Sequence, residues 1–246
     1  MNATLGRNLW LSAVFIGLVG DAARAPAAVQ THHINLEENF PLEVEDAYPG
    51  AYGSWELELP FRYDRTRDGR NLYELVPEVA YGIVRNADIS VAVPVRFGTA
   101  DRTGSGDIEV EAFYNFNTEG LVLPAFALEG AAIVPSGRDT DGVDTRLRLI
   151  ATRSISNRLD RLHANVQYEH NDAPLPGEHD HRWLFILGYS GRLGPDMLIV
   201  ADIIREQERM EDEAANVVEL GLRAMIAPLV VGSAAFGTGF GDESPP

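Results

Sequence analysis

The chain has 246 residues, no cysteine and a formal net charge of −17, and all 20 of its basic residues are arginine. Its length fits a single domain, and without cysteine or lysine it has no disulfide, thiolate ligand, thiol nucleophile or Schiff-base amine. The excess of negative charge excludes nucleic acid as a partner, because phosphates require a basic surface.

The N-terminal residues have the three parts of a secretory signal peptide. Arg7 supplies positive charge, residues 9–19 form an apolar stretch too short to span a bilayer, and Ala25-Pro26-Ala27 offers a small-residue cleavage site. We therefore expect residues 1–27 to be a signal peptide, with an uncleaved anchor or a buried helix as the alternative. No later stretch has 18 consecutive apolar residues, so an exported chain is either soluble or spans a membrane as a β-barrel.

Residues 28–52 are rich in acidic side chains and carry Pro41 and Pro49, which interrupt any long strand. We expect this stretch to be a periplasmic lead-in to the domain that follows.

From residue 53 onward the chain repeats one unit, in which apolar and polar residues alternate over about ten positions and a turn follows. Val91, Val93 and Val95, for example, alternate with Ala92, Pro94 and Arg96. Such alternation places the two kinds of side chain on opposite faces of a strand. The eleven runs are 55–63, 73–83, 89–97, 107–116, 122–134, 144–149, 162–169, 183–189, 197–207, 218–223 and 229–241. The fifth, eighth and ninth alternate poorly.

The linkers between these runs alternate strictly between short and long. The short ones are 85–88, 117–120, 156–160, 191–195 and 227–228, and the longer, more charged ones are 65–70, 99–106, 136–142, 172–180 and 208–213. Bacterial transmembrane barrels have short periplasmic turns and longer external loops. We therefore predict an all-β protein, with residues 53–246 forming an antiparallel up-and-down β-barrel in the bacterial outer membrane. Its expected partners are outer-membrane lipid, lipopolysaccharide and, during insertion, the barrel-assembly machinery.

The strand count is odd, whereas bacterial single-chain barrels have even numbers. With eleven strands, the first (55–63) and the eleventh (229–240) would run parallel and could not share an antiparallel ladder. We expect either a chain truncated relative to a twelve-stranded barrel, with an incompletely sealed seam, or a twelfth strand from residues 33–44.

Several short stretches resemble the outer-membrane family named for meta-pathway phenol degradation. They are WELELP (55–60), PEVAYG (77–82), SGD (105–107), PAFA (124–127), PSG (135–137) and DESP (242–245). The resemblance spans about residues 50–245 and implies a transporter-like barrel, with aromatic compounds as possible solutes. Members of that family typically continue past the DESP stretch into one more strand, and this chain departs from them there.

If the apolar faces meet lipid, the charged residues of the opposite faces line the lumen. These candidates are Glu56, Glu58, Arg62, Glu74, Glu78, Arg96, Asp107, Glu109, Glu111, Arg146, Arg148, Glu169, Glu219 and Arg223. Charges of both signs in a confined space suit either a narrow channel for small solutes or a barrel closed by ion pairs. A third alternative is a soluble exported barrel that binds an apolar ligand, with Val91, Val93 and Val95 pointing inward.

No motif indicates an enzyme, a cofactor or a metal. Glu109 and Glu111 are explained by strand alternation, and Gly188-Tyr189-Ser190-Gly191 lacks the last glycine of a nucleophile elbow. His163 is a lone histidine, and His179 and His181 lie in a polar loop where such residues are expected in any case.

Overall fold

The computed structural model describes residues 8–13, 35–38, 40–65, 70–99, 103–137, 141–155, 160–207 and 214–240. These residues contain no helix, and therefore none that is long and apolar enough to cross a membrane. They form one sixteen-stranded sheet in which every pairing is antiparallel.

The strands are β1 (Asn8–Ala13), β2 (Trp55–Glu58), β3 (Phe61–Arg65), β4 (Asn71–Leu75), β5 (Glu78–Val84), β6 (Ala87–Ala92), β7 (Val95–Gly98), β8 (Gly104–Ser105), β9 (Ile108–Asn117), β10 (Ala125–Val134), β11 (Asp144–Ser154), β12 (Arg161–His170), β13 (His181–Gly194), β14 (Met197–Gln207), β15 (Ala214–Ala227) and β16 (Val230–Gly239). Each of the eleven predicted runs contains strand, so the all-β prediction is confirmed.

Proline interrupts the first three runs without ending them. Pro60 separates β2 from β3, Pro77 separates β4 from β5, and Pro94 separates β6 from β7. Proline has no N–H to donate to a ladder. The ladder nevertheless continues through neighbouring residues, because the Val76 N–H donates to the Pro60 carbonyl and the Val93 N–H donates to the Pro77 carbonyl, each at 3.0 Å. Each such pair of strands is one bent stretch of wall.

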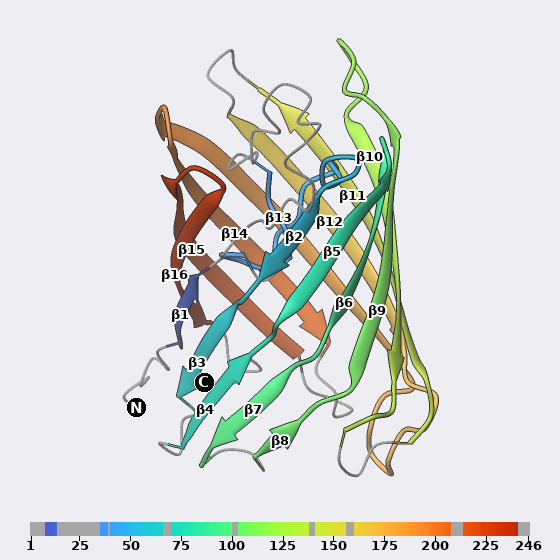
Figure 1. Ribbon diagram of the computed structural model, residues 1–246. Coiled ribbons are helices and arrows are strands. Elements are labelled where there is room, and N and C mark those ends of the chain that lie inside the picture. The colour runs from blue at the N-terminus through green and yellow to red at the C-terminus, as the bar shows by residue number, and fades with distance from the viewer. Residues whose placement is uncertain are drawn as a thin grey trace.

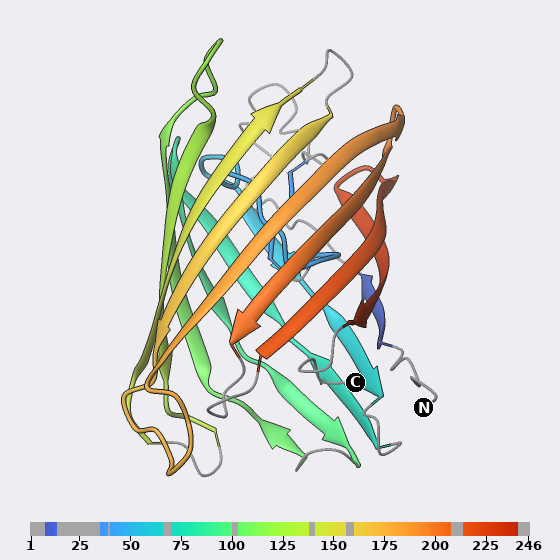
Figure 2. The same cartoon turned by 180° about the vertical axis from the view of Figure 1, so that it is seen from behind.

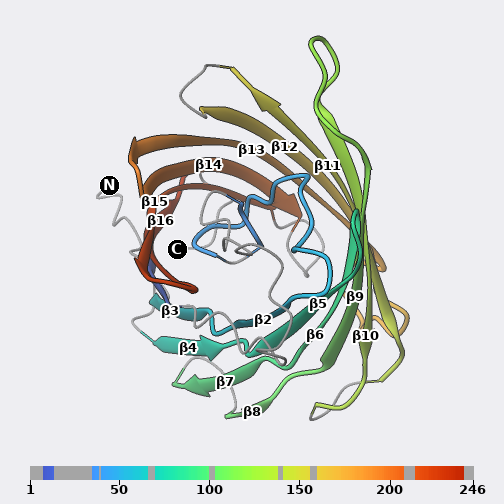
Figure 3. The ribbon, with the colours of Figure 1, turned by 45° about the horizontal axis from the view of Figure 1, so that its top comes forward.

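The sheet curves around a central interior, which Figures 1 and 2 show from two opposite sides. The order of hydrogen-bonded neighbours runs from β5 through β6 and β9 to β16, then to β1 and β3. Figure 3, in which the top of the sheet comes forward, shows the blue segment that precedes β2 lying inside the curve of the strands. Of the lead-in predicted for residues 28–52, the described residues 35–38 and 40–50 therefore lie in the interior, whereas Tyr52 is exposed.

At the predicted seam between the first and the last stretch of the wall, the structure places β1. β1 pairs antiparallel with β16 along its whole length, from Asn8 opposite Gly237 to Ala13 opposite Gly232, and also with β3. The alternative in which residues 33–44 supply the twelfth strand is wrong for its described part. Residues 35–38 and 40–44 make only one isolated bridge, between Glu37 and Phe40, because they are packed inside the sheet.

Burial in the sheet is the reverse of that in a soluble protein. In β11, Leu147 and Leu149 are 52% and 49% exposed, whereas the side chain of Arg148 between them is fully buried. Charged side chains are almost never fully buried in soluble proteins unless they are paired. The third alternative has Val91, Val93 and Val95 pointing inward. In the structure Val91 and Val95 are exposed, Val93 is half-buried, and Ser90, which precedes Val91, is buried.

Cleavage of the predicted signal peptide would remove β1 from the chain. We expect the chain 28–246, refolded in detergent, to melt at a lower temperature than the full chain. Without β1, backbone N–H and C=O groups of β16 and β3 lose their partners, which costs roughly 1–3 kcal/mol for each buried group. The control chain 8–246 keeps β1 and should melt with the full chain. Equal melting temperatures for 28–246 and 1–246, followed by circular dichroism, would show that β1 adds nothing to the wall.

Candidate functional site

Residues 35–50 fill part of the interior, and we call them the interior segment (described residues 35–38 and 40–50). Leu36, Leu42 and Val44 are buried against wall residues that include Ile186 and Val200. Further along, Ala47 and Tyr48 pack with Phe113, Ala125, Ala127 and Ile150. The lack of a side chain at Gly188 lets the segment lie close against the wall, because a Cβ there would be 2.4 Å from Val44 Cγ2. The segment is thus anchored by a small apolar core inside a polar lumen.

Polar side chains of the wall take the place of a neighbouring strand for this segment. The side-chain amide of Asn165 accepts from the Glu45 N–H and donates to the Glu45 carbonyl, both at 2.9 Å. The Ala47 N–H donates to Thr152 Oγ1 at 2.9 Å, and the Val44 N–H donates to an Asp202 carboxylate oxygen at 3.2 Å. Buried backbone groups must be hydrogen-bonded, and here strand side chains supply the partners.

Besides Arg62, which lies 4.0 Å from Glu43, four arginines of the wall reach acidic residues of the interior segment. Arg146 and Arg148 both contact Glu38, at 3.2 Å and 2.5 Å. Arg161 contacts Asp46 at 3.2 Å. Paired charges can remain ionised in a buried environment, whereas unpaired ones are strongly disfavoured. The segment therefore supplies countercharges for the wall.

The fourth arginine, Arg223, is 1% exposed and forms an ion pair with Glu37. Its guanidinium also donates to the Phe40 carbonyl at 2.9 Å and lies over the Phe40 ring, 4.5 Å from the ring centroid. Arg161 likewise lies over the ring of Tyr48, at 4.9 Å. Cation–π contacts of this kind are strongest when desolvated, so these two arginines hold both ends of the segment.

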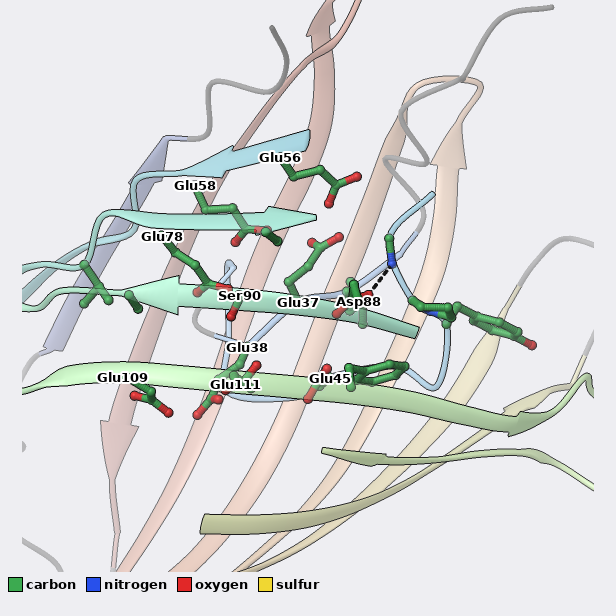
Figure 4. A pocket seen from close by; sticks show the side chains of 18 of the residues that line it. Glu37, Glu38, Glu45, Glu56, Glu58, Glu78, Asp88, Ser90, Glu109 and Glu111 are labelled. Carbon is green, nitrogen blue, oxygen red and sulfur yellow. Dashed lines mark hydrogen bonds between the residues drawn. The ribbon is translucent and has the colours of Figure 1, made fainter. Parts of the chain in front are cut away.

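A cavity lies between the interior segment and the wall strands β2, β5, β6 and β9 (Figure 4). Arg146 is the one guanidinium among the lining residues. Nine carboxylates line the cavity, those of Glu37, Glu38, Glu45, Glu56, Glu58, Glu78, Asp88, Glu109 and Glu111. The space that water-sized molecules can reach is about 90 Å³, enough for several waters at roughly 10–15 Å³ each. The site is therefore a wet and strongly acidic chamber.

The structure brings most of the predicted lumen residues to the interior, where they form groups. Arg146 forms ion pairs with Glu109, with Glu111 at 2.8 Å and with Glu129 at 3.4 Å. Arg148 pairs with Glu38 and Glu45 of the interior segment, at 2.5 Å and 3.4 Å, and donates a hydrogen bond to Gln167 of the wall. Those that line the cavity or touch the interior segment are Glu56, Glu58, Arg62, Glu78, Glu109, Glu111, Arg146, Arg148, Glu219 and Arg223.

The remaining four candidates lie apart from the cavity. Glu74 pairs with Arg96 at 2.7 Å, and Arg96 is exposed, so this pair does not belong to the buried network. Glu169 pairs with Arg182 on the neighbouring strand. Asp107 accepts from the Ser136 and Gly137 N–H groups at 3.0 Å and 2.8 Å, which makes it a turn residue.

Several interior residues were missed by the sequence analysis. Glu129 and Asp202 are 1% and 4% exposed, but they lie in the fifth and ninth runs, where weak alternation hid the face. The acidic residues of the interior segment were read as a solvated lead-in. The one available signal was the density of carboxylates directly before a barrel-like sequence rich in inward-facing arginine.

His163 is a structural residue in this arrangement. It is 3% exposed, and its ring nitrogens lie 3.1 Å from Thr152 Oγ1 and 2.9 Å from Ser190 Oγ. Because Thr152 also accepts from the Ala47 N–H, the chain of hydrogen bonds supports the interior segment. Two groups of acidic side chains among the described residues have spacing suited to a metal ion. One is Glu37, Glu56 and Glu58, and the other is Glu38, Glu111 and Glu129. Neither group includes His179 or His181.

Comparison with models of protein families and with curated proteins gives no match to this chain.

Removing Arg148 should destabilise the fold, because Glu38 and Glu45 would then be buried without their cation. We expect Arg148→Gln to lower the free energy of unfolding by about 3–5 kcal/mol, the usual cost of breaking a buried ion pair. The matched control is Arg96→Gln, whose exposed pair should contribute no more than about 1 kcal/mol. Urea unfolding in detergent measures both. Equal losses for the two variants would contradict the network.

Docking of the interior segment should weaken as pH rises. Burial raises the pKa of Asp46 from 3.8 to about 7 and outweighs the Arg161 guanidinium, which lowers it. Burial also raises the pKa of Glu45 and of Glu43. A released segment would bind these protons less tightly, so this contribution to docking is fully present below about pH 4 and is lost as pH rises through about 7.

Hydrogen exchange of residues 40–50 between pH 5 and pH 8 measures this effect, after correction for intrinsic exchange rates. We expect protection to fall with pH, and Asp46→Asn to flatten the slope. Asp141→Asn, at an exposed loop position, is the control. A slope that is unchanged in Asp46→Asn would assign the pH dependence to other groups.

Proposed function

We propose that the protein is a transmembrane β-barrel of the bacterial outer membrane that passes small solutes and is closed in this conformation by the interior segment. The observation that carries the proposal is the distribution of side chains on the sheet: large apolar side chains are exposed on the outside, and acidic and basic side chains such as Glu129, Arg148 and Arg223 are buried inside. In lipid this arrangement is favourable, because the apolar face meets hydrocarbon and the polar face lines the lumen.

The strand pairing supports a closed wall in a chain that keeps β1, which lies within the predicted signal peptide. When β2 and β3, β4 and β5, and β6 and β7 are joined across their prolines, and β8 and β9 across Gly106 and Asp107, the strands that follow residue 53 give eleven stretches. β1 pairs with the last of them and, through two residue pairs, with the first. A sheet without edges satisfies its backbone in hydrocarbon, which an open sheet does not.

Aromatic side chains gather at both ends of the wall, as expected for membrane interfaces. At the end with short turns, Trp55 lies against Tyr81, with ring centroids 4.5 Å apart. At the end with long loops, Tyr73 is stacked on Phe97 at 5.3 Å. Trp183 lies at that same end and is 44% exposed. These residues would anchor the barrel at the two faces of the bilayer.

The acidic lining favours cationic solutes over anions. Nine carboxylates face one guanidinium around the cavity, and rings of Asp and Glu select cations in channels. Passage of neutral aromatic compounds, which the family resemblance suggests, has less support from the lining, where Tyr48 and Phe113 are the two aromatic residues.

A non-conducting barrel is the second candidate, and the ion pairs of the interior segment favour it. The five arginines that bind the segment are on β3, β11, β12 and β15, so they hold it from several parts of the wall. If the segment never leaves, the barrel has a structural rather than a transport role.

Conductance in planar bilayers separates the two. We expect the full chain to conduct little and a variant lacking residues 35–50 to conduct with cation selectivity, because the deletion empties an acidic lumen. Circular dichroism and a heat-dependent shift on gels confirm folding of both. A folded deletion variant that does not conduct would contradict the transport proposal. Recovery of the full chain in a detergent-free periplasmic extract would contradict the membrane proposal itself.

A further inference from the structure

We propose that Glu37, Glu56 and Glu58 form a calcium site inside the acidic cavity, joining the interior segment to the wall. This goes beyond the transport function and does not depend on it, since a cation can bind whether or not the lumen conducts. One carboxylate oxygen of each residue can be chosen so that all three lie within 4.8 Å of one another. Figure 4 shows the three carboxyl groups turned toward the same part of the cavity.

Glu58 gives the independent reason to expect a ligand. It is only 5% exposed and lines the cavity, and no hydrogen bond or ion pair joins its carboxylate to another described residue. Its position on β2 follows from strand alternation, which directs Glu56 and Glu58 to the same face. A buried carboxylate without a partner is strongly disfavoured unless a cation or a proton neutralises it.

The charge of the cluster suits a divalent cation. Among the described residues, Arg223 is the one arginine that pairs with the cluster, through Glu37, so three carboxylates and one guanidinium leave a net charge of −2. The second acidic group is different. Glu38, Glu111 and Glu129 all lie within 3.4 Å of the same Arg146 guanidinium nitrogen, which already occupies the place of a cation.

The number and kind of ligands favour calcium over magnesium. Calcium binds oxygen at about 2.3–2.6 Å, so ligands of one ion lie up to roughly 4.6–5.2 Å apart, which accommodates three oxygens within 4.8 Å of one another. Magnesium usually keeps several waters and binds one or two carboxylates. Calcium also takes 6–8 oxygen ligands. Three carboxylates that bind with one or two oxygens each, together with waters in the cavity, can supply that number.

Such an ion would fasten the interior segment at the side that has few arginines. Arg146, Arg148 and Arg161 hold the segment toward β11 and β12, whereas the facing strands β2, β5 and β6 present carboxylates to it. Glu37 belongs to the segment, and Glu56 and Glu58 belong to β2. A calcium ion between them would replace the repulsion between these carboxylates by a link between the interior segment and β2.

The test uses the full chain, refolded in detergent, stripped with chelator and studied at pH 8. Isothermal titration with calcium chloride is expected to show one saturable site, and magnesium chloride is expected to bind at least about tenfold more weakly. Glu58→Gln and Glu56→Gln should each weaken calcium binding by about tenfold or more. Glu109→Gln is the matched control, because it lines the same cavity but its carboxylate already pairs with Arg146. It should bind calcium as the unaltered chain does.

Thermal melting keeps the proposal testable if a variant's binding signal is small. In chelator, Glu58→Gln should melt at the same temperature as the unaltered chain or higher, because it removes an unpaired buried charge. Calcium should raise the melting temperature of the unaltered chain and of Glu109→Gln, and leave that of Glu58→Gln unchanged. Absence of calcium binding by the unaltered chain would overturn the site. So would equal weakening by Glu109→Gln and Glu58→Gln, which would indicate attraction by the whole cavity, or equal affinity for magnesium and calcium.

Discussion

Arginine side chains directed into a narrow protein interior require carboxylates within reach, and residues 35–50 provide them here. Arg148 and Arg223 are almost completely buried, and each contacts an acidic residue of the interior segment. Burying a guanidinium in that position without a partner would cost far more free energy than a single ion pair contributes. The position of the segment, the polarity of the wall and the shape of the remaining cavity all follow from this compensation.

The same constraint explains why the wall has two such different faces. Strand geometry sends neighbouring residues to opposite sides, so a charged interior comes with an apolar exterior along the same strand. β11 shows this directly, with Arg146 and Arg148 inside and Leu147 and Leu149 outside. Asn165 and Thr152 complete the inner face, since they bond the backbone of a segment that lies too far from any strand to join the ladder.

The sequence was sufficient to predict the strands, because period-two alternation is a local property that each run carries by itself. It was also sufficient to place Glu58, Arg148 and Glu219 on the inner face. It was insufficient for Glu129 and Asp202, whose runs are apolar on both faces where the wall packs against the interior segment. The path of residues 35–50 was not predictable in this way, since an acidic stretch with two prolines looks the same in solvent as inside a lumen of arginines. β1 was missed for a related reason: six residues of an apolar stretch fit a signal peptide and a strand equally well.

The central claim is that residues 35–50 lie inside the wall, and thiol labelling tests it most directly because the chain has no cysteine of its own. Ala47 is fully buried and Tyr52, five residues later, is 63% exposed. Single-cysteine variants Ala47→Cys and Tyr52→Cys would be folded in detergent and treated with a charged maleimide. We expect rapid labelling at position 52 and slow labelling at position 47, at a rate limited by release of the segment. Equally rapid labelling at both positions in the folded protein would contradict the account.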